Sequence, residues 1–110
     1  MKKLALTLIG FTLCAPALAE NLLCSIKLNT EKVSEQRREV ASGEAAAFGV
    51  VDGYRFKVTN QGGSKFEIEV FDPTIPARHY ATGSLKDSTD VVQWSFWSQD
   101  VILDASCRLN

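Results

Sequence analysis

YRFKVTNQGGSKFEIEVF, residues 54–71, is the stretch that decides the fold class of this chain. On both sides of a glycine-rich centre, apolar residues alternate with polar or charged ones. A period of two is typical of a β-strand that is buried on one face, and a short segment rich in Gly, Asn and Ser is typical of a turn. The stretch therefore predicts a β-hairpin closed by residues 60–64.

The charges of the two halves indicate a register for this hairpin. A five-residue loop over 60–64 brings basic residues of the first strand opposite acidic residues of the second, and such pairs stabilise a sheet. The expected apolar pairs are Phe56 with Ile68 and Val58 with Phe66, and the expected charged pairs are Lys57 with Glu67 and Arg55 with Glu69.

The same alternation appears at both ends of the chain. Leu22, Cys24, Ile26 and Leu28 share one face of a predicted strand, and Val101, Leu103, Ala105, Cys107 and Leu109 share one face of another. Each cysteine lies on the apolar face of its strand. We therefore expect a buried Cys24–Cys107 disulfide that ties the terminal strands together, worth about 4–5 kcal/mol in the chain-entropy model.

Further strands are expected over residues 78–86 and 91–97, with a proline-containing loop over 72–76 and a turn over 87–90. Residues 30–42 are compatible with a charged edge strand or with a short helix capped by Thr30 and stopped by Gly43. The strand is preferred because β-strands flank the segment on both sides. The expected fold is all-β: an antiparallel sandwich or small closed barrel of about seven strands, with one disulfide between the terminal strands.

Residues 1–19 have the pattern of a secretory signal peptide. Lys2 and Lys3 precede an apolar run, and Ala17 and Ala19 are the small residues that a signal peptidase recognises. The apolar run is too short for a transmembrane anchor, and neither Cys14 nor Cys24 has the context of a lipoprotein cysteine. The predicted organisation is a signal peptide over 1–19 and a single β domain over 20–110, exported to the periplasm or secreted by a bacterium.

Composition and motifs exclude several classes of function. Removing Lys2 and Lys3 with the signal peptide changes the net charge from −1 to about −3, which disfavours nucleic acid and anionic membranes as partners. Cys24 and Cys107 are too far apart for a CxxC redox motif and have no histidine neighbours for zinc. The sequence contains no HExxH, Walker, GxGxxG, GxSxG or EF-hand pattern, so no cofactor or metal is expected.

Paired carboxylates are the remaining signature of a hydrolase. Glu67 and Glu69 have expected basic partners, and Asp87 and Asp90 lie in a predicted turn. Such carboxylates keep low pKa values, whereas a general acid needs a raised one. His79 is the single histidine, and an ordinary surface histidine is the favoured interpretation, with a catalytic base as the alternative.

The candidate binding residues are Phe71, Arg78, His79, Tyr80 and Trp97. If Trp94 and Phe96 face the core, Trp97 faces outward, and the hairpin register turns Phe71 outward as well. An outward Trp is a common interface anchor. The alternatives are a bulge near Ser98–Asp100 that returns Trp97 to the core, or a sheet covered on both faces.

In size, export and architecture the chain is similar to the small disulfide-bearing periplasmic proteins that inhibit lysozymes. That likeness implies a non-catalytic module that binds another protein of the cell envelope, with inhibition of an envelope-directed hydrolase as its expected activity. The alternative functions are a small periplasmic hydrolase that uses His79 and a structural subunit of the envelope or cell surface.

Overall fold

The computed structural model describes residues 19–110, which form an all-β structure without helix. The predicted signal peptide lies outside the described residues except for Ala19, the first residue of the first described strand. The strands are β2 (Ala19–Leu28), β3 (Glu31–Ala41), β4 (Ala45–Val51), β5 (Tyr54–Gly62), β6 (Lys65–Asp72), β7 (Ala77–Ser84), β8 (Val92–Trp97) and β9 (Ile102–Leu109). Within residues 19–110, no helix has the length and apolar character needed to cross a membrane.

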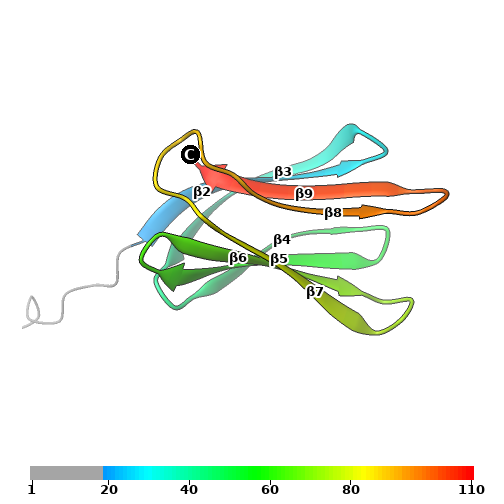
Figure 1. Cartoon of the computed structure of the whole chain (residues 1–110), viewed down its shortest axis with the longest axis horizontal. Helices are drawn as coiled ribbons and strands as arrows, with labels where there is room; N and C mark the ends of the chain where they lie inside the picture. Colours follow the sequence, from blue (N-terminus) through cyan, green and yellow to red (C-terminus); the bar gives the residue numbers. More distant parts are fainter. Residues whose placement is uncertain (1–18) are drawn as a thin grey trace, which may run out of the picture.

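The strands form two antiparallel sheets that face each other (Figure 1). One sheet has the order β3-β2-β9-β8, and the other has the order β4-β5-β6-β7. The first sheet therefore contains both terminal strands, side by side at its centre, while the second is a simple meander. This arrangement confirms the antiparallel all-β fold and its sandwich form.

The terminal strands are joined by the expected disulfide. Cys24 lies directly opposite Cys107 in the β2–β9 ladder, and the two Cα atoms are 4.1 Å apart. This is slightly less than the usual range of about 4.4–6.8 Å, because the two residues face each other on adjacent strands. Both cysteines are completely buried. The alternation in β2 and β9 thus predicts correctly which faces meet.

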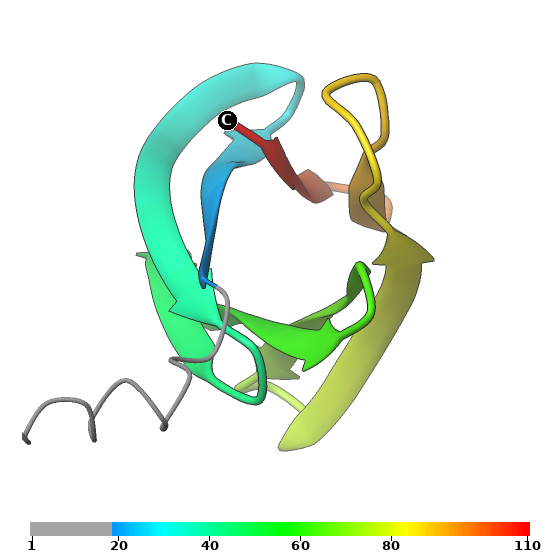
Figure 2. The same ribbon diagram turned by 90° about the vertical axis from the view of Figure 1, so that its left-hand side faces the viewer.

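Pairing of the terminal strands does not close the molecule into a barrel. Viewed from its end, the structure is a ring of strands in which β3 lies beside β4 and β7 beside β8 (Figure 2). No ladder of backbone hydrogen bonds joins either of these pairs in the described chain. The structure is therefore the sandwich of the two expected forms and not the closed barrel, because the terminal strands lie inside one sheet.

The core fills the space between the sheets and follows the alternation of the strands. Its aromatic centre consists of Phe48, Phe56 and Trp94, with ring centroids 5.8 and 6.1 Å apart in the two neighbouring pairs. The other buried apolar residues are Leu22, Cys24, Ile26, Val40, Tyr54, Val58, Phe66, Ile68, Val70, Leu85, Val92, Leu103, Ala105 and Cys107.

The β5–β6 hairpin forms as predicted, but the expected register is wrong by two residues. Phe56 pairs with Val70, and Lys57 pairs with Glu69. The turn consists of Gly63 and Ser64 alone, both with positive φ, as a two-residue hairpin turn requires. A bulge between Asn60 and Gly62 absorbs the extra residue. Since the shift is an even number of residues, every side chain keeps its predicted face.

Two other segments bear on the sequence analysis. Residues 31–41 form the strand β3, so the preferred strand is confirmed against the capped helix. No pattern in the sequence predicts β4, because its three alanines have low β propensity and a bulge before Gly49 interrupts the alternation. At that bulge the backbone of β4 approaches Ile26 of the other sheet.

Candidate functional site

The outer face of the β4–β7 sheet presents its side chains in rows that run across the strands. In one row, Phe71 of β6 lies between Arg55 of β5 and Arg78 of β7. The guanidinium carbon of each arginine is 5.6 Å from the centroid of the Phe71 ring. This is cation–π distance, so the half-buried ring holds two cations beside it.

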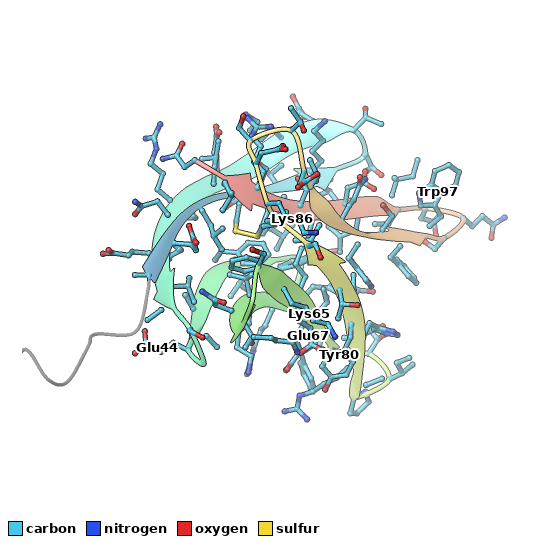
Figure 3. The ribbon with its side chains drawn as sticks, turned by 60° about the vertical axis from the view of Figure 1, so that its left-hand side comes forward. Glu44, Lys65, Glu67, Tyr80, Lys86 and Trp97 are labelled. Carbon is cyan, nitrogen blue, oxygen red and sulfur yellow. A yellow bond between two sulfur atoms is a disulfide. The ribbon has the colours of Figure 1, made fainter. Side chains whose placement is uncertain are left out.

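The adjacent row contains Lys57, Glu69 and Tyr80. Glu69 forms ion pairs with Lys57 Nζ at 3.6 Å and with Arg78 Nε at 3.1 Å, so its carboxylate links the two rows. Tyr80 is 54% exposed. Figure 3 shows Tyr80 on this sheet, on the side away from the other sheet.

A hollow of about 310 Å³ lies among these side chains and is rich in positive charge. Its lining residues are Ala47, Arg55, Phe56, Lys57, Glu69, Phe71 and Arg78. Three of them are basic and one is acidic. Arg38 of β3 lies at the same side, since its Nε donates to the carbonyl oxygen of Ala47 at 2.9 Å. The hollow is therefore locally cationic in a chain whose formal net charge is −1.

A second hollow, of about 380 Å³, lies at the other end of the sheets and has a structural origin. It lies beside the Gly63–Ser64 turn and Asn60. The side-chain Nδ2 of Asn60 donates to the Val40 carbonyl oxygen at 3.0 Å, and its Oδ1 accepts from the backbone N–H of Gly62 at 2.9 Å. One end of this buried side chain thus joins β3 to β5, and the other end holds the bulge between Asn60 and Gly62.

His79 lies on the inner side of β7, opposite Val70, and not on the surface as the sequence favours. It is half-buried, and its ring centroid is 6.1 Å from that of Trp94. Its Nε2 atom is buried and has no hydrogen-bond partner in the described chain. A catalytic base needs a nucleophile or a water within hydrogen-bond reach. Within residues 19–110, no Ser or Asp side chain lies within that reach of His79 Nε2.

Asp72, at the end of β6, lies in the same inner region. The hydrogen bond from the Thr74 hydroxyl is the main cause that holds the pKa of Asp72 below its ordinary value, and burial acts in the opposite direction. His79 adds a smaller lowering through its charge. Burial is the main cause that raises the pKa of Tyr54, and the neighbouring carboxylate of Asp72 raises it further.

Trp97 ends β8, and its side chain is 74% exposed. The inward residues of the strand are Val92, Trp94 and Phe96, and the rings of Trp94 and Phe96 stack at 6.3 Å. Trp97 thus faces outward, and no bulge returns it to the core. Figure 1 shows the β8–β9 hairpin reaching far out at this end of the molecule, and Figure 3 shows Trp97 near its tip.

The β2–β3 turn is joined to this hairpin close to its tip. The Asn29 amide donates to the Ile102 carbonyl at 2.7 Å, and the Ile102 amide donates to Asn29 Oδ1 at 2.9 Å. Ile102 is the partner of Trp97 across the β8–β9 ladder. Two hydrogen bonds from the backbone and side chain of Asn29 therefore fix the position from which the indole projects.

The members of the two carboxylate pairs differ in their partners. Glu69 is engaged with two cations, while Glu67 lies opposite Thr59 and not opposite a basic residue. Hydrogen bonds from the side chain and backbone of Thr89 lower the pKa of Asp87. Within residues 19–110, no group of three or more potential metal-ligating side chains is present.

The predicted binding residues thus occupy three places. Phe71, Arg78 and Tyr80 share the outer face of one sheet, His79 lies inside, and Trp97 projects from the other sheet. Sequence reasoning missed Arg55 as a site residue, although its place between Tyr54 and Phe56 already put it on the outer face. Comparisons with protein-family models, with curated proteins and with solved structures find no match to this chain.

Proposed function

We propose that this protein is an exported, non-catalytic binding module of the bacterial periplasm or exterior, and that its partner is another protein of the cell envelope. The exposed indole of Trp97 carries the proposal. Tryptophan has a large apolar surface, and in protein interfaces it is among the residues that contribute most binding free energy. Exposure of that apolar surface to water does not stabilise the isolated chain, whereas covering it with a partner contributes binding free energy.

The shape of the contact favours a cleft in the partner. Trp97 lies at the end of the edge strand β8, next to the turn Ser98–Asp100. The hydrogen bonds of Asn29 and the buried disulfide hold the hairpin in one conformation, which reduces the entropy lost on binding. A rigid projection with one aromatic anchor suits the substrate cleft of a hydrolase, so the proposed activity is inhibition of an envelope-directed hydrolase such as a lysozyme.

One edge strand argues against the alternative of a structural subunit. The edge strand β3 carries charged side chains along most of its length, and such edges resist pairing with another chain. Light scattering of the oxidised protein tests this point, and growth of assemblies with concentration would favour the structural subunit.

The binding proposal is tested with a panel of lysozymes and other envelope hydrolases, using pull-down and inhibition assays. Replacing Trp97 with Ala should weaken binding of the target by about 30-fold or more, because loss of a central aromatic anchor costs about 2 kcal/mol or more. Val33→Ala, which also removes an exposed apolar side chain but from β3, should leave binding unchanged.

Trp97→Phe separates the aromatic contact from a general effect, and it should retain part of the affinity. All three variants should keep the thermal midpoint of the wild type, since both positions are exposed. Equal binding by wild type and Trp97→Ala would contradict the proposed contact. If no hydrolase of the panel binds the protein, the proposed inhibition of a hydrolase is wrong. Hydrolytic activity lost in His79→Ala would instead favour an enzyme.

A further inference from the structure

We infer that the outer face of the β4–β7 sheet holds a second binding site, which takes the carboxylates of an acidic polypeptide segment. The site is centred on the row Arg55–Phe71–Arg78. It goes beyond the proposed contact at Trp97, because it lies on the other sheet and uses charge instead of an exposed indole.

The two arginines are held in place before any ligand arrives. Each guanidinium packs against the Phe71 ring, with its carbon 5.6 Å from the ring centroid. Packing against an aromatic ring restricts the long side chain, while the N–H groups at the edge of the guanidinium plane can still donate. Pre-ordered arginine forks lose less entropy when they bind, and their geometry matches that of a carboxylate.

Charge at this place is unbalanced. The hollow of about 310 Å³ has Arg55, Lys57 and Arg78 in its lining, against the single carboxylate of Glu69. Glu69 engages Lys57 and Arg78, and in the described part of the chain Arg55 forms no ion pair. Glu69 also shows the chemistry that the site accepts, because it is a carboxylate already bound between two of the cations.

The surroundings favour a polypeptide over a phosphate-bearing membrane. The neighbouring strand β4 presents small exposed apolar side chains, those of Ala45, Ala47 and Val50. On the other side, Tyr80 adds an exposed aromatic ring. An extended segment that alternates acidic and apolar residues can contact both kinds of surface. A membrane surface requires a broad positive face, but Glu67 and Glu69 interrupt the cations here.

The test uses the oxidised protein and a blocked peptide of three Glu-Ala repeats at low ionic strength. NMR spectra follow the side-chain Nε–Hε signals of Arg55 and Arg78 and the amide of Phe71. The peptide should shift these signals saturably, whereas the peptide of three Gln-Ala repeats should not. Inorganic phosphate and phosphatidylglycerol vesicles are titrated in parallel. A response to either of them, without a response to the Glu peptide, would overturn the assignment to a polypeptide.

Paired variants separate this site from a general effect of charge. The double variant Arg55→Gln/Arg78→Gln should weaken binding of the Glu peptide at least about tenfold, as expected for lost hydrogen bonds to charged groups. The control Arg37→Gln/Arg108→Gln makes the same change of charge on the other sheet and should leave the affinity within about twofold of the wild type. Equal weakening by both double variants would overturn the site.

Glu69→Gln provides a test of opposite sign. Removing the internal carboxylate frees Lys57 and Arg78, so affinity for the Glu peptide should rise about two- to fivefold. Glu67→Gln removes the same charge from the neighbouring row, where the described chain shows no ion pair, and should have a smaller effect. Weaker binding in Glu69→Gln would contradict the proposed role of the three cations.

Discussion

Asp72 and Asp87 each begin a turn with the sequence Asp-X-Thr. In both turns the aspartate accepts hydrogen bonds from the backbone amide and the hydroxyl of the threonine two residues later. In both, these bonds lower the pKa of the carboxyl. The two turns differ in burial, because Asp72 is buried at the end of β6 and Asp87 is exposed in the β7–β8 loop.

Thr74→Val tests the contribution of the buried turn to acid stability. Without the hydroxyl, the pKa of Asp72 should rise toward its ordinary value. A group with a depressed pKa in the folded state stabilises the protein above its unfolded pKa, about 3.9 for Asp. The wild type should therefore be more stable than the variant near pH 6, and this advantage should shrink as the pH falls below about 4 toward the folded pKa.

Denaturant unfolding between pH 2 and pH 7 measures the difference in stability, and NMR titration measures the pKa of Asp72. Thr89→Val makes the same change in the exposed turn, so it should raise the pKa of Asp87 and leave that of Asp72 unchanged. A pKa of Asp72 that is the same in Thr74→Val and the wild type would contradict the assigned cause.

Single residues were predictable where the period of two fixes their face. The period predicts the outward Trp97 and the buried cysteines because each belongs to an unbroken alternation. His79 departs from the expectation because it follows the proline loop, where the sequence leaves the phase of the next strand undetermined. The role of Arg55 as a site residue depends on its contact with Phe71 and on the nearby Arg78. These residues lie on other strands, and the sequence alone does not give the register of those strands.

At the scale of elements, the sequence predicts strands better than it predicts how they pair. The hairpin over residues 54–71 forms, but its register depends on whether the loop has five residues or two. The strands are joined by a two-residue turn with positive φ and a bulge, and not by a simple five-residue loop. The residues that face each other across the hairpin are therefore shifted by two positions. β4 escaped prediction for a related reason, since its bulge near Gly49 breaks the alternation.

Gly49 allows β4 to cross close to the other sheet, and this contact can be measured. A Cβ atom at Gly49 would lie 2.7 Å from Ile26 Cδ1, which is buried in the core. Gly49→Ala should therefore destabilise the protein by about 1–3 kcal/mol, the usual cost of overpacking, and the positive φ of 155° at this position adds backbone strain. In an Ile26→Val background, which lacks that Cδ1 atom, the cost of Gly49→Ala should be smaller.

A double-mutant cycle of urea unfolding gives this coupling free energy. Gly83→Ala is the matched control, because its Cβ would have only ordinary van der Waals contacts with Val92 at 3.5 Å or more. It should change stability by less than about 1 kcal/mol. Additive effects of Gly49→Ala and Ile26→Val would contradict the proposed clash.

On the scale of the whole molecule, the disulfide is the main covalent constraint. It joins residues 83 positions apart, and the chain-entropy model assigns about 4–5 kcal/mol to a loop of this length. For a small domain this is a large part of the total stability. Reduction should therefore lower the thermal midpoint by roughly 20 °C.

The midpoint is measured by circular dichroism after reduction in denaturant and refolding, because the buried bridge is inaccessible in the folded protein. The variant Cys24→Ala/Cys107→Ala should have the same midpoint with and without reductant, which shows that the reductant acts through the bridge. An unchanged midpoint of the fully reduced wild type would mean that the bridge contributes little to stability.

The strand order also has a consequence for the speed of folding. Every ladder in the described chain joins strands that are consecutive in sequence, except the ladder between β2 and β9. The consecutive pairs are local contacts that form early, whereas the β2–β9 pair requires the longest search through conformations. A chain that is oxidised before it folds has already completed that search. The bridge that stabilises the finished sheet thus also shortens the path to it.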